Sequence, residues 1–194
     1  MTEAKPYKIS VPQAKIDRLK AKLELVDFPT ELEEAQWDYG SPLADIKRLH
    51  SFWLNSYDWR KAEAQLNKMS HFTMDIPVEG YDSLNIHFVH HKSEVKGAIP
   101  LLFVHGWPGS FDEVKKLLEP LTKPDEGQPA FHVVAPSLPG FGFSEAAKKK
   151  GFRTKQMAEI FNKLIQNLGY DQYGESLLYV LRLSEEITIF HIYV

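Results

Sequence analysis

Apolar side chains recur at three- and four-residue spacing through the first seventy residues, which predicts helices over 10–25, 41–54 and 59–69. Ser10 and Ser41 stand where side-chain N-caps are expected, and a proline follows each serine within two residues. The apolar stripes of the first two helices consist of Ile16, Leu19, Leu23 and Leu25, and of Leu43, Ile46, Leu49 and Trp53. Because such apolar area needs a partner surface, we expect this helical segment to pack on the remainder of the chain.

From about residue 70 the pattern changes from helical to alternating. The segments 72–76 and 84–91 alternate apolar and polar positions, and the turn residues 79–82 lie between them. This arrangement predicts a β-hairpin. We therefore place a boundary near residue 70, between a helical segment and a domain that contains a sheet.

Beyond the hairpin, strands and helices alternate. The uninterrupted apolar run 100–104 is typical of a strand that is buried on both faces, and the largely apolar segment 131–136 is interpreted as another buried strand. Helical spacing returns over 110–122 and 154–169, and Gly169 ends the second of these helices. The alternation predicts an α/β domain in which helices cross over between parallel strands.

Composition and charge narrow the function classes. The 194 residues carry a formal net charge of −3 and are 43% hydrophobic and 25% charged, as in an ordinary globular protein. This balance offers no basic surface for nucleic acid or an anionic membrane. No apolar run approaches the roughly 20 residues of a membrane span, and no apolar leader is seen, so a cytoplasmic protein is expected. The absence of cysteine excludes a thiolate metal site, and no metal is expected.

The segment LLFVHGWPGSFDE, residues 101–113, joins a predicted buried strand to a predicted helix through a tight turn. The carboxyl ends of parallel strands are where α/β folds place their ligands. Glycine in such a turn lets a backbone N–H approach a substrate, and the dipole of the following helix favours negative charge there. The turn therefore marks a candidate site, with a purely steric need for glycine at a helix start as the alternative.

The wider pattern resembles a known family. The motifs HGWPGS (105–110), APSLPGFGFS (135–144) and NLGYDQYG (167–174) resemble those of the α/β-hydrolase fold, and more narrowly epoxide hydrolases of the microsomal and juvenile-hormone type. FPTELEEAQWDYG (28–40) and YDWRKAEAQLN (57–67) are similar to the N-terminal domain of that family. The resemblance extends from about residue 5 to Gly174.

The resemblance implies an architecture. The expected fold is α/β, an incomplete α/β-hydrolase sheet that is mostly parallel, with an N-terminal antiparallel hairpin and a preceding helical segment. We divide the chain into the helical N-terminal segment 1–70, the N-terminal part of the hydrolase domain 71–174 and a divergent tail 175–194.

The resemblance also implies a chemistry. Enzymes of this family open epoxides with an aspartate nucleophile and form an alkyl-enzyme ester, which a water activated by histidine then hydrolyses. The matching oxyanion-hole donor is the backbone N–H of Trp107, Gly106 keeps its approach open, and Pro108 sets the turn through a cis bond after Trp107. A small apolar epoxide is the implied substrate, and no cofactor is implied.

Several other residues have competing interpretations. His105 is interpreted as a residue that organises the turn by hydrogen bonds to nearby backbone, and a role as catalytic base is the alternative. His87, His90 and His91 are interpreted as strand-surface residues and not as metal ligands. Phe141 and Phe143 are candidates for the substrate pocket or, alternatively, anchors of the core.

After Gly174 the chain departs from the family pattern. The family continues into a glycine-flanked aspartate, whereas this sequence has no aspartate after Asp171, so no nucleophile is assigned. Ser176 in GESLL could form a serine nucleophile elbow, but Leu178 replaces the required glycine, and the preceding strand has little room. We therefore expect a truncated epoxide hydrolase homologue that is inactive alone.

A non-enzymatic module is the alternative function, binding a partner or a full-length relative through an unfinished sheet, with self-association at the exposed edge. The predicted position of the tail bears on that edge. Loss of the nucleophile strand would leave 101–104 as an apolar edge. We expect residues 177–182 to pair with it in parallel, and residues 187–194 either to add a further strand or to remain an exposed end.

Overall fold

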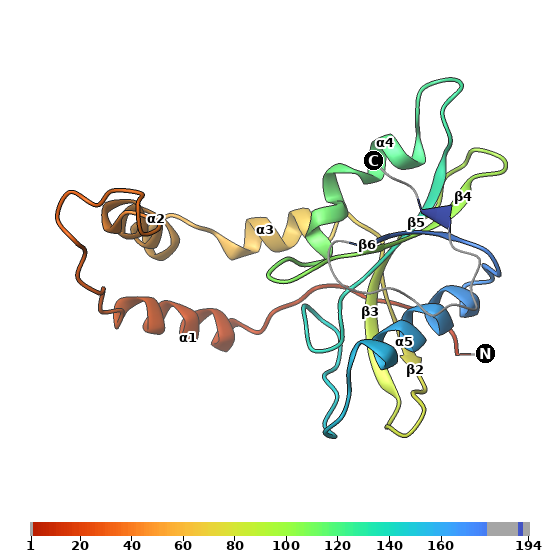
Figure 1. The fold of residues 1–194 in the computed structure, drawn as a ribbon, viewed down its shortest axis with the longest axis horizontal. Coiled ribbons are helices and arrows are strands. Elements are labelled where there is room, and N and C mark those ends of the chain that lie inside the picture. Colours follow the sequence, from red (N-terminus) through yellow and green to blue (C-terminus); the bar gives the residue numbers. More distant parts are fainter. Residues whose placement is uncertain (1, 178–189, 192–194) are drawn as a thin grey trace. The chain divides into compact units, whose positions relative to one another are not determined.

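The fold is described from a computed structural model of the chain, covering residues 2–177 and 190–191. The chain folds into two compact units. The first comprises Met1–Lys8 and Asn67–Val194, and the second comprises Ile9–Leu66. Figure 1 shows the elements of both units along the chain.

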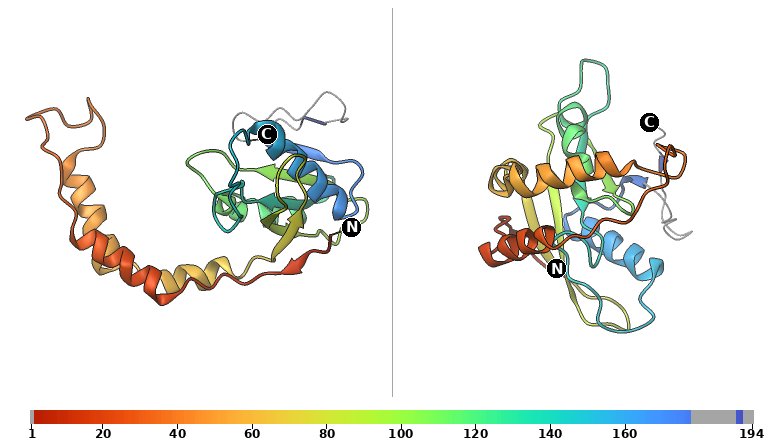
Figure 2. Two further views of the ribbon diagram at one scale, coloured as in Figure 1. Left: turned by 90° about the horizontal axis from the view of Figure 1, so that it is seen from below. Right: turned by 90° about the vertical axis from the view of Figure 1, so that its left-hand side faces the viewer.

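The second unit consists of the helices α1 (Gln13–Glu24), α2 (Leu43–Asn55) and α3 (Trp59–Leu66), with a long irregular link between α1 and α2 (Figure 2). The predicted caps at Ser10 and Ser41 are wrong. The N-cap residues are prolines 12 and 42, in extended conformation and without a side-chain cap bond. Since each serine lies before its N-cap position, its hydroxyl does not cap the first turn.

A carboxylate ties the start of this unit to its last helix. Glu63 accepts hydrogen bonds from the Val11 N–H at 2.6 Å, from Arg60 at 2.8 Å and from Trp59 Nε1 at 3.2 Å. These donors, the Val11 N–H first, lower the pKa of the Glu63 carboxyl. Arg60 also donates to the carbonyl of Val11 at 2.9 Å. The segment that leads into α1 is thus fixed to α3, although the two are far apart in sequence.

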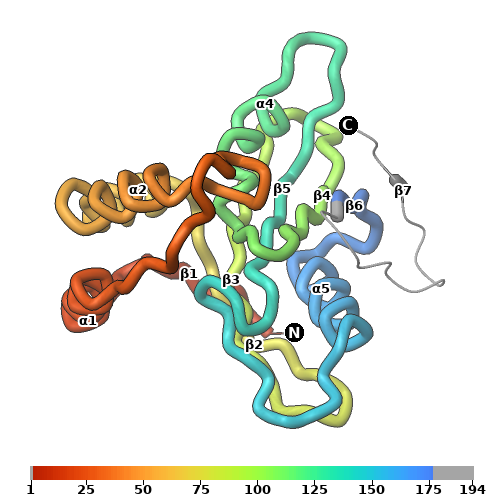
Figure 3. Tube along the Cα trace, turned by 60° about the vertical axis from the view of Figure 1, so that its left-hand side comes forward, coloured from red at the N-terminus to blue at the C-terminus, as the bar shows by residue number. Residues whose placement is uncertain are grey.

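The first unit is built on a mixed sheet. Among the described residues the strands lie in the order β1-β2-β3-β5-β4-β6-β7 (Figure 3). The bounds are β1 Lys5–Pro6, β2 His71–Ile76, β3 Leu84–His91, β4 Ile99–Val104, β5 Phe131–Pro136, β6 Gly174–Leu177 and β7 Phe190–His191.

The strand pairs confirm the predicted α/β class. Strands β2 and β3 form the predicted antiparallel hairpin, with Thr73 opposite His87. The β3–β5 pair is also antiparallel, whereas β5, β4, β6 and β7 pair in parallel. Strand β4 lies between β5 and β6, as expected for the strand that precedes the glycine-rich turn.

Opposite faces of the sheet carry different helices. Helix α5 (Thr154–Asn167) packs on one face over a core that includes Ile86 and Phe88 of β3. Since side chains alternate along a strand, His87 points to the other face, where its ring meets that of Phe111 at 4.9 Å. Phe111 begins the 3₁₀ segment η1 (Phe111–Lys116), which is followed by α4 (Leu118–Thr122).

The single helix predicted over 110–122 is therefore wrong. Pro120 has no backbone N–H, and its ring conflicts with the carbonyl four residues earlier, at Lys116, where the 3₁₀ segment ends. The prediction over 154–169 is closer, because α5 ends at Asn167 and Gly169 follows with φ of 88°. That left-handed conformation is the one which favours glycine after a helix.

The prediction that a strand from the tail pairs in parallel with residues 101–104 is correct, but the residues that form this strand differ from the predicted 177–182. Strand β6 pairs in parallel with β4, placing Leu101 opposite Gly174 and Val104 opposite Leu177. The pairing strand thus begins three residues before the predicted 177, and residues 178–182 lie outside the described residues. Phe190 and His191 form β7 beside β6, and the remainder of 187–194 also lies outside. Ser176 lies within β6, opposite Phe103, and not on a turn after the strand.

Candidate functional site

The candidate site is the turn that follows β4. The peptide bond between Trp107 and Pro108 is cis, which confirms the prediction. The indole of Trp107 is 81% exposed, whereas His105 at the start of the turn is only 2% exposed. Ser110 caps η1 by accepting a hydrogen bond from the Asp112 N–H at 3.3 Å. The turn is therefore anchored at both ends and accessible in its middle.

His105 organises the turn as predicted. The Leu138 N–H donates to Nε2 of His105 at 3.1 Å, so this nitrogen carries no proton. The ring proton is then on Nδ1, which lies 3.0 Å from the carbonyl oxygen of Gly106. Because backbone groups engage both ring nitrogens, the geometry supports an organising role and not that of a base.

Gly109 gives the turn room for a carboxylate. A Cβ placed on Gly109 would overlap Oε1 of Glu113 and would lie 3.2 Å from the Gly106 carbonyl oxygen. Glu113 is the third residue after the N-cap Ser110, the position of the acidic residue in a capping box. Glycine therefore leaves room here for the Glu113 side chain, which would have to shift around a larger residue. The φ of Gly109 does not lie in the left-handed region, so its backbone conformation alone does not call for glycine.

Phe141 and Phe143, in the segment 135–144, have different surroundings. The ring of Phe141 lies 6.0 Å from that of His105, beside the turn. The ring of Phe143 packs against Tyr7 at 5.7 Å, His87 at 5.3 Å and Phe111 at 5.9 Å. Phe143 therefore belongs to a cluster of rings with Tyr7, His87 and Phe111. A role in the substrate pocket stays a prediction for both phenylalanines.

The interpretation of the β3 histidines as surface residues is wrong for His87 and His90. Their exposed fractions are 0% and 8%, while His91 is half-buried. Strand β3 lies between β2 and β5, with both faces covered, so polar residues along it are enclosed. Alternation of polar and apolar residues did not distinguish this strand from one with a solvent-exposed face.

Burial keeps these two histidines neutral. Burial, with the nearby charge of His71 second, lowers the pKa of His87 to about 3. Burial also lowers the pKa of His90 to about 4, with smaller contributions from the charges of Lys92, His132 and His91. Nε2 of His90 lies 3.0 Å from the Tyr170 hydroxyl, on the α5 side of the sheet.

The sequence analysis missed the partners of His87. Nε2 of His87 lies 3.0 Å from Nδ1 of His71, and its Nδ1 lies 2.9 Å from Oγ of Ser137. His71 is in β2, and Ser137 directly follows β5. The available signal was a histidine at the start of one strand, a histidine within a second strand and a serine directly after a third.

The described part of the chain shows neither a metal-ion site nor a membrane-spanning helix. No group of three histidine, cysteine, aspartate or glutamate side chains there could hold a metal ion. Within the same residues, every helix is too short or too polar to traverse a lipid bilayer.

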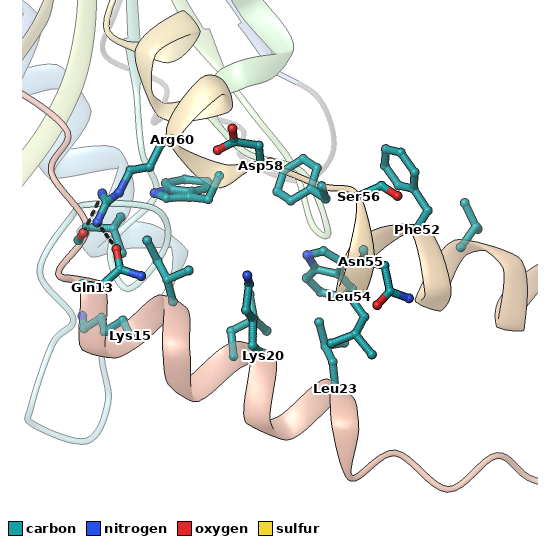
Figure 4. A pocket seen from close by; sticks show the side chains of 17 residues that line it. Gln13, Lys15, Lys20, Leu23, Phe52, Leu54, Asn55, Ser56, Asp58 and Arg60 are labelled. Atoms are coloured by element: carbon teal, nitrogen blue, oxygen red, sulfur yellow. Dashed lines mark hydrogen bonds between the residues drawn. The ribbon is translucent and has the colours of Figure 1, made fainter.

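The helical unit carries a separate groove of about 880 Å³ (Figure 4). Its lining includes Leu19 and Leu23 of α1 and Leu49 and Trp53 of α2, which belong to the two predicted stripes. Arg60 closes one end by donating to Gln13 at 3.0 Å. The stripes thus face each other across the groove, and packing of this unit on the sheet stays a prediction.

The sheet order and the turn after β4 define the class of protein. A model of the alpha/beta hydrolase fold matches residues 99–177, which contain β4, the turn, β5, α5 and β6. A model of the epoxide hydrolase N terminus matches residues 4–114, more than half of the chain. The chain belongs to the epoxide hydrolase family.

Relatives from animals support this assignment. The chain is 39% identical over 173 residues to juvenile hormone epoxide hydrolase 1 of Ctenocephalides felis, covering 87% of this chain and 36% of that protein. It is 38% identical over 177 residues to epoxide hydrolase 1 of Sus scrofa, covering 87% and 38%. The crystal structure of juvenile hormone epoxide hydrolase from Bombyx mori matches with a TM-score of 0.79 at 33% identity, covering 90% of this chain and 41% of that one. The chain thus spans well under half the length of these relatives.

Proposed function

We propose that this chain supplies the N-terminal part of an enzyme that hydrolyses small apolar epoxides to vicinal diols. In the proposed reaction, an aspartate outside these 194 residues forms an alkyl-enzyme ester, and a water activated by histidine hydrolyses it. The backbone N–H of Trp107 stabilises the negative charge that develops on the ester oxygen during this second step.

The turn after β4 is the observation that carries this proposal. The hydrogen bonds of His105 anchor its backbone, and Gly106 adds no side chain that would block the Trp107 N–H. Preorganised backbone donors are worth several kcal/mol at developing charges, since removal of one donor typically costs about 10²–10³ in kcat.

A chimaera tests this function directly. Residues 1–177 are joined to the C-terminal part of the Bombyx mori enzyme, and diol formation from an aryl epoxide is measured. We expect turnover, and we expect Gly106→Val to reduce it about 10²-fold because the added side chain blocks the donor. The matched control is Gly127→Asn, at a loop glycine where an added Cβ would meet nothing within 4 Å; asparagine is used because the φ of Gly127 is 86°, a left-handed conformation that it tolerates better than other side chains do. A folded chimaera without turnover would contradict the proposal.

We further propose that the 194-residue polypeptide alone does not turn over epoxides, because its sequence contains no aspartate after Asp171 to act as nucleophile. Purified chain incubated with aryl and alkyl epoxides is expected to give no diol above buffer. Robust turnover would refute this expectation.

A non-enzymatic interaction module remains the second candidate. Strand β6 covers the edge of β4, and β7 pairs with β6 at Gly174 and Glu175. A partner strand adding beyond this pairing would complete the sheet. Light scattering of the purified chain distinguishes the cases, because self-association supports the module and a monomer across the concentration range argues against it.

A further inference from the structure

A buried line of polar side chains runs from β2 toward the candidate site. It consists of His71, His87 and Ser137, which we call the His–His–Ser chain. Successive members lie 3.0 Å and 2.9 Å apart, and their exposed fractions are 4%, 0% and 0%. Both ring nitrogens of His87 are engaged, one by each neighbour.

Aromatic rings enclose the middle of this chain. The ring of His87 lies 5.3 Å from Tyr7, 4.9 Å from Phe111 and 5.3 Å from Phe143. An apolar side chain in this position would bury equal surface without the cost of desolvating an imidazole. The polar residue instead specifies one arrangement of its partners, because a buried polar group that loses its hydrogen bond is costly.

His87 is also bonded to the loop after β5 through its main chain. Its carbonyl accepts from the Ser137 N–H at 2.8 Å, and its N–H donates to Ser144 Oγ at 3.0 Å. Ser144 Oγ in turn donates to the Ser137 carbonyl at 2.8 Å. A Cβ on Gly142 would lie 2.5 Å from Ser137 Oγ, so the loop closes tightly over this hydroxyl.

The loop connects directly to the turn. The residue after Ser137 is Leu138, whose N–H donates to Nε2 of His105 at 3.1 Å. This bond sets the Nδ1–H tautomer of His105, which donates to the Gly106 carbonyl. The direction in which Leu138 presents its N–H follows from the conformation at Ser137.

We propose that His87 is a positioning residue which, through Ser137 and Leu138, fixes the tautomer of His105 and thereby the backbone of the turn around Trp107. The catalytic significance of this coupling rests on the proposed function, while the coupling itself is a property of the chain as it stands. A purely structural role would stabilise β3 without a specific effect on His105.

The experiment uses the 194-residue chain and no substrate. Long-range ¹⁵N–¹H NMR reports the tautomer of His105, and hydrogen exchange reports the bond from the Leu138 N–H. In the unmodified chain, Nε2 of His105 is expected to be unprotonated. In His87→Leu we expect a mixture of His105 tautomers and about tenfold faster exchange at Leu138, as for loss of about one hydrogen bond's stabilisation.

Two conservative variants separate the two sides of His87. An asparagine places its amide near the Nδ1 position of histidine, and a glutamine places its amide near Nε2. His87→Asn should therefore retain the contact with Ser137 and the His105 tautomer, whereas His87→Gln should lose both. Ser137→Ala removes the hydrogen bond between His87 Nδ1 and Ser137 Oγ by deleting the hydroxyl, with little change in volume. It should produce the same change in the His105 tautomer and in Leu138 exchange as His87→Leu, and it provides the test if His87→Leu folds poorly.

His90→Leu is the matched control, because His90 is a second buried histidine on the opposite face of the same strand. It should leave the His105 tautomer and Leu138 exchange unchanged. An unchanged His105 tautomer in Ser137→Ala, or an equal change in His90→Leu, overturns the proposal. Neither readout depends on epoxide turnover, so failure here is distinct from failure of the chimaera.

Discussion

Acid is expected to destabilise the sheet-containing unit through its buried histidines. The pKa values of His87 and His90 are about 3 and about 4 in the folded chain, against an ordinary value of 6.5. At pH values between the folded pKa and 6.5, each histidine is protonated in the unfolded chain but neutral in the folded chain, so the unfolded chain binds more protons. The free energy of unfolding therefore falls as the pH falls below about 6.5.

The magnitude follows from these pKa values. Between about pH 7.5 and about pH 5, each histidine should lower the free energy of unfolding by about 2 kcal/mol, with a limiting slope of about 1.4 kcal/mol per pH unit. The two together remove about 4 kcal/mol, a large share of the ~5–15 kcal/mol typical of a domain. The carboxyls of Asp75, Glu145 and Glu159 have lowered pKa values, so their stabilisation is lost only at more acidic pH.

Urea unfolding followed by circular dichroism at a series of pH values measures this slope. Replacing one histidine isolates its share, and His90→Leu is suitable because its partner Tyr170 is only partly buried and can bond to water. For a folded pKa of about 4, the average slope between about pH 6.5 and about pH 5 should fall by about 1 kcal/mol per pH unit, because the unfolded histidine is only half protonated at the upper end of this interval. A wild-type slope near zero over this interval would show that the histidines are not held neutral and would refute the reasoning.

Three further predictions concern packing and local anchoring. Gly109→Ala should lower the free energy of unfolding, measured in urea, by about 1 kcal/mol, and by less when Glu113 is also replaced by alanine. Additive effects of the two substitutions would contradict the overlap of the new Cβ with the Glu113 carboxylate. Glu63→Ala should speed hydrogen exchange of the Val11 amide and the first turn of α1, and unchanged rates would argue against the carboxylate anchor. Leu164→Ala, at a fully buried position of α5, should cost about 2–5 kcal/mol of stability, and a cost below about 1 kcal/mol would contradict the packing of this core.

Much of the sheet could be predicted because its signals are local. The strands over 72–76, 84–91, 100–104 and 131–136 appear within one or two residues of their predicted bounds. Strand β6 was predicted to start three residues late because Gly-Glu-Ser at 174–176 has the composition of a turn, and its pairing with β4 is long-range.

The candidate turn could be predicted from the sequence, whereas the buried hydrogen bonds of His87 beside it could not. The predictions of the cis bond and of the role of His105 rested on the resemblance of a motif of a few adjacent residues to a known family. The partners of His87 come from β2 and from the loop after β5, which only the folded sheet brings together. Since strand burial on both faces depends on the neighbours of the strand, alternation alone misplaced His87 and His90 at the surface.

The strand order also determines when the chain can assemble during its synthesis. Strands β3 and β4 leave the ribosome before β5, yet β5 lies between them and bonds to both. The β2–β3 hairpin can close early, whereas the apolar strand β4 has no neighbour until residues 131–136 have emerged, and it gains its second neighbour only with residues 174–177. Translation speed across this interval and protection of the nascent chain by chaperones will therefore influence how much of it reaches the folded state.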